Sequence, residues 1–216
     1  MAGSTRLIPA NRSGVKKGAD FSGVVVWLTS TEAPPSEAIA KRAKMLQKDK
    51  SFSPHILAIQ TGTSVDFPNL DPIFHNAFSN YEGQIFDIAL YPPGSSRTVH
   101  FYRPGIVRVF CNIHPSMSAI IVVVSSKDFA TTDRDGHYSI PNVSPGTYQI
   151  HFFSERATPE TLAKLTHDIS VGDGSESLAS VAISEAGYLP VAHKNKYGRD
   201  YPVDNAGFAT YSPTIR

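Results

Sequence analysis

Short runs of β-branched and aromatic residues, separated at close intervals by Pro-Gly turns, dominate the middle of this chain. One stretch, FDIALYPPGSSRTVHFYRPGIVRVFC, holds three such runs and two Pro-Gly turns. Short strands at regular spacing, bounded by turn residues, are typical of a β-sandwich or a β-barrel. The sequence therefore predicts an all-β fold.

Three segments depart from this rhythm. Residues 31–50, TEAPPSEAIAKRAKMLQKDK, place Ile39, Ala43 and Leu46 at helical spacing after a Pro pair, which predicts a short surface helix or an ordered loop. The stretch TPETLAKL predicts a short helical turn. The stretch from Gly187 onward is irregular but too rich in aromatic residues for simple disorder, so we expect it to pack along the body.

A second β-rich region follows Ser125. The stretch FATTDRDGHYSIPNVSPGTYQIHFF holds two hairpin sequences, and two further strands follow it. We therefore expect a flexible N-terminus over 1–19, a first domain over 20–125, a smaller β-sandwich over 126–186 and a packed tail over 187–216. The run GVVVWL either opens the first domain, which we prefer, or completes the second sandwich with the first domain inserted into it.

Composition and charge exclude several classes of function. The formal net charge is +1, whereas nucleic-acid-binding proteins usually carry a basic excess or stripe, so we expect no nucleic acid partner. No run of about 18 apolar residues is present, so we expect no transmembrane helix. The opening MAGSTRLIPANRSG lacks the apolar run of a secretory signal peptide. A single cysteine cannot form an internal disulfide, so cysteine pairing does not indicate a compartment.

The cysteine lies in the stretch VRVFCNIHPSMSAIIVVV, where Cys111, His114 and Met117 follow the pattern Cys-x2-His-x2-Met. Cys111 ends one expected strand and Met117 begins the next, so their side chains can converge at one end of a sandwich. A trigonal copper site needs two histidines, one cysteine and a long axial thioether. Zinc is the chief competitor for such ligands, but methionine is a poor zinc ligand.

The second histidine must come from another loop. We predict His75, in FPNLDPIFHNAFS, and regard His55 and His100 as rivals that are more simply structural. Each of the other residues also has a plain structural explanation. Cys111 would be a small buried hydrophobe, Met117 core filling and His114 a surface loop residue. Their occurrence together, with strands on both sides, favours one copper ion.

The histidine segment and the cysteine segment together resemble the sequence pattern of a known protein family. His-Asn followed downstream by Cys-x-x-His-Pro-x-Met resembles the cupredoxins, the blue-copper proteins, with the short ligand loop of the amicyanin type, over about residues 50–124. The resemblance implies a Greek-key β-sandwich that holds one type 1 copper ion. It implies a role in single-electron transfer between redox protein partners, without enzymatic chemistry. The ligands it implies are His75, Cys111, His114 and Met117.

The same resemblance implies roles for neighbouring residues. Asn76 would tie the two ligand loops together and steady the thiolate through its backbone N–H. Partners would dock near His114, and the port for the electron would be framed by apolar residues around it, namely Ile113, Pro115, Pro72 and Phe74.

Residues 126–185 resemble a different family, the transthyretin-like, carboxypeptidase-regulatory-like β-sandwiches, on the stretch FATTDRDGHYSIPNVSPGTYQIHF. This resemblance implies a non-catalytic module. Similar two-part chains occur as periplasmic or exported bacterial proteins, so the resemblance implies a place outside the cytoplasm.

Other motifs in the sequence give weaker indications of function. Asp133, Asp135 and Gly136 resemble the start of a calcium loop, but the acidic twelfth position is missing, and we predict a hairpin turn. No His-x-His pair occurs, which argues against an oxygen-reducing copper cluster. The basic and aromatic stretch 193–201, HKNKYGRDY, could contact a partner, but we favour a segment docked on the protein surface.

Two alternative functions remain open for the protein, a copper carrier or storage protein and a metal-free assembly module.

Overall fold

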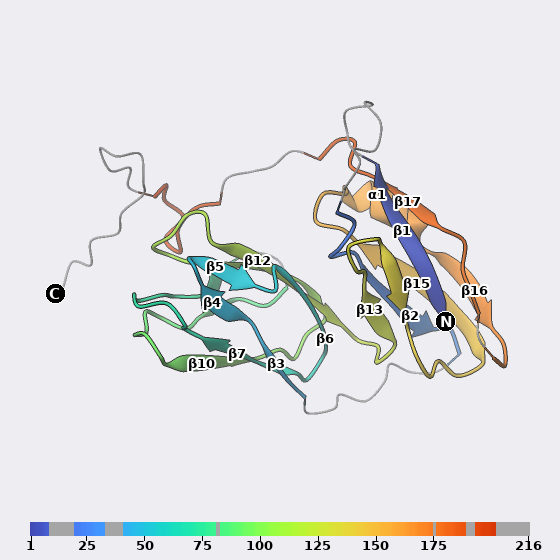
Figure 1. The fold of residues 1–216 in the computed structure, drawn as a ribbon, viewed down its shortest axis with the longest axis horizontal. Coiled ribbons are helices and arrows are strands. Elements are labelled where there is room, and N and C mark those ends of the chain that lie inside the picture. The colour runs from blue at the N-terminus through green and yellow to red at the C-terminus, as the bar shows by residue number, and fades with distance from the viewer. Residues whose placement is uncertain (9–19, 33–40, 81–82, 175, 189–192, 202–216) are drawn as a thin grey trace. The chain divides into compact units, whose positions relative to one another are not determined.

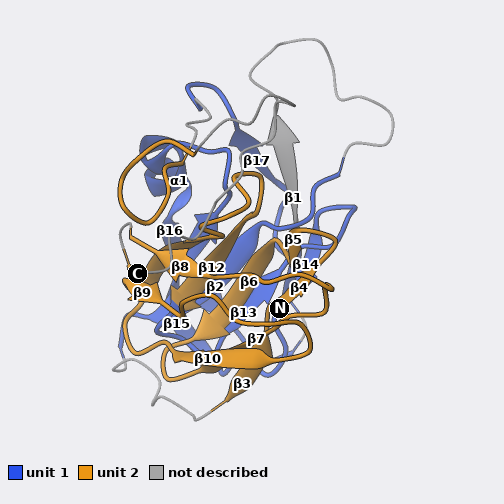
Figure 2. Ribbon diagram, turned by 90° about the vertical axis from the view of Figure 1, so that its left-hand side faces the viewer, with its two compact units in different colours: residues 1–37, 124–190 blue, residues 38–123, 191–216 orange. Residues whose placement is uncertain are grey.

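The computed structural model describes residues 1–8, 20–32, 41–80, 83–174, 176–188 and 193–201. The chain divides into two compact units, each built from two separate stretches of sequence. Unit 1 comprises Met1–Glu37 and Val124–Pro190, and unit 2 comprises Ala38–Val123 and Val191–Arg216 (Figure 2).

Unit 2 is a β-structure made of short strands, as the turn spacing predicts (Figure 1). One sheet has the order β10-β7-β3, a second has the order β6-β12-β11-β8-β9, and β4 and β5 form a separate pair. The strands are β3 (Arg42–Lys44), β4 (Leu46–Lys48), β5 (Ser51–Ser53), β6 (Ile56–Gln60), β7 (Ser64–Pro68), β8 (Phe78–Ser79), β9 (Phe86–Asp87), β10 (Ser96–His100), β11 (Gly105–Phe110) and β12 (Ser118–Val124).

The two sheets of unit 2 share one buried core. Alternate residues of β7 and β10, among them Val65 and Phe67, contribute to the same cluster as Val107, Val109 and Ile121 of β11 and β12. Successive side chains on a strand point to opposite faces, so this alternation directs one face of each sheet inward. β11 and β12 pair in antiparallel register over their whole length, which fixes the positions of the residues just beyond their ends.

Unit 1 contains a four-stranded sheet of order β13-β2-β15-β16 and a three-stranded sheet of order β14-β1-β17. Residues from both sheets, such as Leu28, Ile150 and Ile183, belong to a second buried core. The predicted helical turn is confirmed as α1, whose N-terminus is capped by the Thr158 hydroxyl. The elements are β1 (Ala2–Ile8), β2 (Val25–Ser30), β13 (Phe129–Thr131), β14 (His137–Ser139), β15 (Gly146–Phe153), α1 (Pro159–Leu165), β16 (His167–Val171) and β17 (Val181–Ser184).

The place of β2 differs from the one we preferred. β2 contains most of the run GVVVWL, and it pairs with both β13 and β15, so it completes the sheet of unit 1. Its Val26 and Leu28 pack into the unit 1 core, which is the physical reason for this pairing. The expected bounds 20–125 and 126–186 therefore do not coincide with the compact units, and the alternative, a first domain inserted into the second, is the arrangement observed.

Both ends of the expected division also differ. Residues 1–19 were expected to be flexible, but Ala2–Ile8 forms β1, which pairs with β14 and β17. The remainder of that segment, 9–19, lies outside the described residues. Of the tail expected over 187–216, residues 187–188 belong to unit 1, and residues 193–201 belong to unit 2 and pack on it. Residues 189–192 and 202–216 lie outside the described residues.

The helix considered for residues 31–50 is wrong over 41–48, where the structure has β3 and β4; residues 33–40 lie outside the described part of the chain. β3 pairs with β7 and β4 pairs with β5, so tertiary pairing outweighs the helical spacing of a few apolar residues. The turn at Asp133 is confirmed, since its carboxylate accepts the N–H groups of Asp135 and His137. The strands that flank this turn pair with β2 and β1, so the expected hairpin does not form.

Within its described residues the chain has no helix with the length and apolar character needed to span a membrane.

Candidate metal centre

The stretch Cys111–Met117, called here the ligand loop, connects β11 to β12. The last register pair of these strands joins Phe110 to Ser118, so the loop is anchored at both ends by the ladder. Within the loop, the Cys111 N–H donates to the Met117 carbonyl over 3.2 Å, and the Met117 N–H donates to the His114 carbonyl over 3.0 Å. The loop therefore forms a tight turn that brings its first, fourth and seventh residues together.

His75 reaches the ligand loop from the segment before β8. Its backbone exchanges two hydrogen bonds with Tyr91, over 2.9 and 3.2 Å, which fix its position. Nδ1 of His75 lies 3.9 Å from the Cys111 sulfur, and Nδ1 of His114 lies 3.6 Å from the same sulfur. The two imidazole rings are 4.8 Å apart at a tilt of 57°. The structure therefore brings three of the four predicted ligands together.

The spacing of these donor atoms fits a bound metal ion. One ligand atom from each of His75, Cys111 and His114 lies within 4.8 Å of the other two. Metal–nitrogen and metal–sulfur bonds are about 2.0–2.3 Å long, so donors that share one ion lie roughly 3–4 Å apart. Two soft or borderline nitrogen donors and one thiolate suit copper or zinc. No other such cluster of histidine, cysteine and acidic residues occurs among the described residues.

Met117, the fourth predicted ligand, is fully buried in the core of unit 2. Its backbone accepts from Cys111 and donates to His114, as given above, so it is tied to both loop ligands.

Asp71 orients His75. One oxygen of the buried Asp71 carboxylate lies 2.7 Å from Nε2 of His75, which is itself completely buried. Because a carboxylate accepts, we assign the ring proton to Nε2, which leaves the lone pair of Nδ1 directed toward the Cys111 sulfur. Carboxylate–histidine pairs of this kind hold many metal-binding histidines in one orientation and tautomer.

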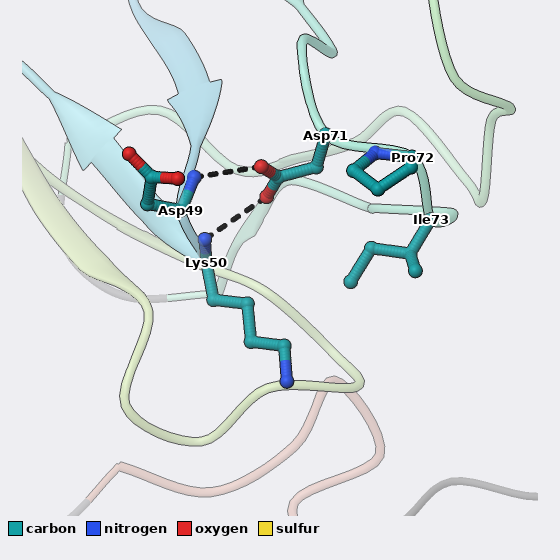
Figure 3. Close-up of a pocket in the computed structure, with 5 residues that line it drawn as sticks. All are labelled: Asp49, Lys50, Asp71, Pro72 and Ile73. Atoms are coloured by element: carbon teal, nitrogen blue, oxygen red, sulfur yellow. Dashed lines mark hydrogen bonds between the residues drawn. The ribbon is translucent and has the colours of Figure 1, made fainter.

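The turn between β4 and β5 holds the Asp71 carboxylate in place. It accepts the backbone N–H groups of Asp49 and Lys50 over 2.7 and 2.9 Å (Figure 3). Burial acts to raise the pKa of Asp71, but these hydrogen bonds and the one from His75 outweigh it, so the pKa lies below the ordinary value. The carboxylate is therefore ionised. Asp71 lines a surface pocket together with Asp49, Lys50, Pro72 and Ile73.

Asn76 joins the two ligand-bearing segments, as the cupredoxin resemblance implies. Its side-chain oxygen accepts the Asn112 N–H over 3.2 Å, and its amide donates to Asp87 over 2.8 Å. Burial raises the pKa of the Cys111 thiol, while backbone N–H groups of Ile113, Asn76 and His114 act to lower it. Hydrogen bonds from these N–H groups therefore favour the thiolate form that a metal requires.

His114 is half-buried, whereas His75 and Cys111 are fully buried. Burial, followed by the nearby His75 and Lys50, lowers its pKa to about 4. The imidazole is therefore neutral at physiological pH, the form that coordinates metals.

The rival histidines lie elsewhere. Nδ1 of His55 is 3.0 Å from the Ser118 carbonyl, and Nδ1 of His100 is 3.2 Å from the Ser64 hydroxyl. Both side chains are exposed, and neither belongs to the cluster. The position of His55 and His100 outside the cluster is consistent with the structural roles that the sequence analysis favoured for them.

Two features of the site were missed in the sequence analysis. Asp71 precedes His75 by four residues, and that spacing in LDPIFH was a usable indication of a partner for the histidine. His193 and Tyr201 also contact the ligand loop, through hydrogen bonds to the carbonyls of Pro115 and Cys111. Nothing local in the sequence indicates those contacts.

No protein-family model matches the chain, and no curated protein matches it. Among solved structures, a copper-containing nitrite reductase from Thermus scotoductus matches 44% of this chain with 27% identity and a TM-score of 0.37. The match spans only 25% of that reductase.

Two smaller proteins are matched over nearly their whole length. A purple cupredoxin from Nitrosopumilus maritimus matches 38% of this chain and is covered over 99% of its own, with 23% identity and a TM-score of 0.35. Amicyanin from Paracoccus versutus matches 45% of this chain and is covered over 97% of its own, with 20% identity and a TM-score of 0.36. The chain is thus similar to cupredoxin and amicyanin structures over less than half of its length.

Proposed function

We propose that unit 2 is a type 1 copper domain that carries single electrons between redox partner proteins. The observation that supports this most directly is the convergence of the Cys111 sulfur with Nδ1 of His75 and Nδ1 of His114. A thiolate with two imidazoles, and a buried thioether from Met117 beside them in the chain, is the ligand set of blue-copper electron-transfer sites.

The residues around the ligands support electron transfer rather than metal exchange. Bound copper would supply a one-electron couple between Cu(I) and Cu(II). Asp71 and the backbone pairing with Tyr91 hold His75, and the β11–β12 ladder holds both ends of the ligand loop. Soft sulfur ligands favour Cu(I) and imidazoles also suit Cu(II), so a ligand set held in one place can serve both oxidation states.

We place the electron port at His114. Pro115, next to it in the chain, is exposed, and Phe74, next to His75, is 53% exposed. A partner that docks over these apolar side chains would approach the half-buried His114 ring. Redox partners of this kind typically use small interfaces, which permit rapid dissociation after transfer.

We assign unit 1 a non-catalytic role, as a transthyretin-like accessory module, on its sequence resemblance. A location outside the cytoplasm rests on the same resemblance. Fractionation of cells that express the gene tests this location, and recovery of the protein only in the cytoplasmic fraction would contradict it.

A visible spectrum of the purified full chain after Cu(II) loading tests the proposed function. We expect intense thiolate-to-copper charge-transfer absorption and a reversible one-electron voltammetric wave. Labile Cu(I) with no reversible couple would instead identify a copper carrier. Preferential retention of zinc, or no uptake of metal at all, would overturn the proposal.

Replacing Met117 with glutamine should leave copper bound but lower the reduction potential. A thioether is a soft, weak axial ligand that favours Cu(I), whereas an amide oxygen is harder and favours Cu(II). The potential is measured by voltammetry of the two copper-loaded proteins.

Met45→Gln is the matched control, because Met45 is likewise fully buried in the unit 2 core. Both substitutions introduce an amide into that core and should lower its stability. Only Met117→Gln should lower the potential, and equal potentials for the two variants would refute an axial role for Met117.

A further inference from the structure

Residues 193–201, called here the strap, form an ordered segment of unit 2 that the copper site as described does not use. The side-chain oxygen of Asn195 accepts the N–H groups of Tyr197 and Arg199, and the backbone of Asn195 pairs with Arg199 and Gly198. Asn195 is buried, so the strap is a compact turn built around one side chain. This segment is the basic and aromatic stretch that the sequence singled out.

The strap forms hydrogen bonds to three residues of the ligand loop. The Tyr201 hydroxyl donates to the carbonyl of Cys111 over 2.8 Å. Nε2 of His193 donates to the carbonyl of Pro115 over 2.6 Å. The backbone N–H of Lys196 donates to the side-chain oxygen of Asn112 over 2.9 Å. These contacts fall on either side of His114 in the chain.

Packing and charge reinforce these bonds. The His193 ring stacks on Phe110, the residue before Cys111, with centroids 4.1 Å apart, and its edge meets the Tyr201 ring. Lys196 forms an ion pair of 2.7 Å with Asp87, whose other oxygen accepts from Asn76. The strap is thereby connected to both segments that carry candidate ligands.

We infer that the strap is a positioning element for the copper site, with Tyr201 and His193 as positioning residues that hold the ligand loop in its metal-binding arrangement. The inference rests on the proposed function. A loop that is already ordered loses less conformational entropy when it binds its ligand, which increases affinity. Residues that orient metal ligands typically contribute about 10–100-fold to metal affinity. The strap should therefore slow the release of copper.

Three variants of the full chain test this inference. Tyr201→Phe removes the hydroxyl, which lies 2.8 Å from the Cys111 carbonyl and 3.2 Å from Nδ1 of His193. His193→Ala removes the contacts to Pro115 and Phe110 and also the one to the Tyr201 hydroxyl. Tyr197→Phe is the matched control, because it makes the same chemical change in the same segment at a side chain that is 61% exposed. The readouts are Cu(I) transfer to bathocuproine disulfonate, the charge-transfer spectrum, and hydrogen exchange of the ligand-loop amides in the metal-free protein.

We expect Tyr201→Phe and His193→Ala to release Cu(I) about 5–10-fold faster than wild type, the effect of losing one hydrogen bond to a ligand-bearing loop. Their charge-transfer bands should shift and their loop amides should exchange faster, while Tyr197→Phe should match wild type in all three readouts. Melting temperatures of the metal-free variants should fall by no more than a few degrees, the cost of one or two lost contacts, and circular dichroism should show that each variant is folded, which separates positioning from general unfolding.

The outcomes distinguish the inference from the function on which it rests. If wild type shows the charge-transfer band and all three variants release Cu(I) at its rate, the positioning role is refuted and the copper function stands. If wild type shows no band, the copper function fails, and the positioning role fails with it. Loop exchange would then report only whether the strap orders the loop for another purpose.

Discussion

Replacing Cys111 with serine should abolish the charge-transfer absorption of the copper-loaded protein and lower its Cu(I) affinity by more than about 100-fold. Loss of an outer partner of a ligand costs about 10–100-fold, and loss of the thiolate itself should cost more. Serine is nearly isosteric, and Cys111 is fully buried, so the fold should be retained. Absorption spectroscopy and competition with a Cu(I) chelator measure the two effects.

The histidines supply a matched pair for this experiment. His75→Ala should also lose the copper spectrum, because its Nδ1 faces the sulfur, whereas His100→Ala should keep it. Circular dichroism of the metal-free variants checks that each is folded. Tight Cu(I) binding by Cys111→Ser, or equal copper affinity of the two histidine variants, would contradict the assigned ligands.

The second large effect is expected from Asp71→Asn. The two carboxylate oxygens of Asp71 accept three N–H groups, from His75, Asp49 and Lys50. Asparagine keeps one acceptor oxygen and replaces the other with a donor, so at least one of these bonds must be lost. We expect copper affinity to fall by about 10–100-fold, the usual cost of removing the carboxylate partner of a metal-binding histidine. The negative charge of Asp71 stabilises Cu(II) relative to Cu(I). Its removal should therefore raise the reduction potential.

Asp66→Asn is the control. Asp66 is a carboxylate of the same unit that accepts from Thr98 and Arg42 on the β10-β7-β3 sheet and contacts none of the candidate ligands. Chelator competition and voltammetry should show wild-type copper affinity and potential for Asp66→Asn. A similar loss in both variants would mean that Asp71 acts through general electrostatics or stability and not through His75.

Three of the four candidate ligands could be singled out from the sequence because they lie close together in one short stretch. Cys111, His114 and Met117 fall within seven residues, and the flanking strand patterns place both ends of that stretch at one end of a sandwich. His75 required a choice among distant histidines. The choice rested on its place in a loop between strands, and the geometry agrees with it.

The features that were missed depend on long-range pairing. β2 has the apolar pattern of any buried strand, and nothing local states that its partners lie more than a hundred residues away, in β13 and β15. The segment around Ala43 has helical spacing, but the energy of pairing with β7 decides its conformation. Tyr201 contacts Cys111 across 90 positions of sequence, which no local pattern encodes.

The division of each unit into two stretches of chain has a consequence for synthesis on the ribosome. The strand β2 is synthesised before β13 and β15, so its inter-strand hydrogen bonds can form only after those two strands have been made. The residues from Ala38 to Val123 can meanwhile collapse around their own core, since domains generally fold as units while the chain grows. The strap follows both in the chain, so the ligand loop receives the contacts of His193 and Tyr201 only after unit 1 and the rest of the unit 2 core have been made, and metal capture should be a late step of maturation.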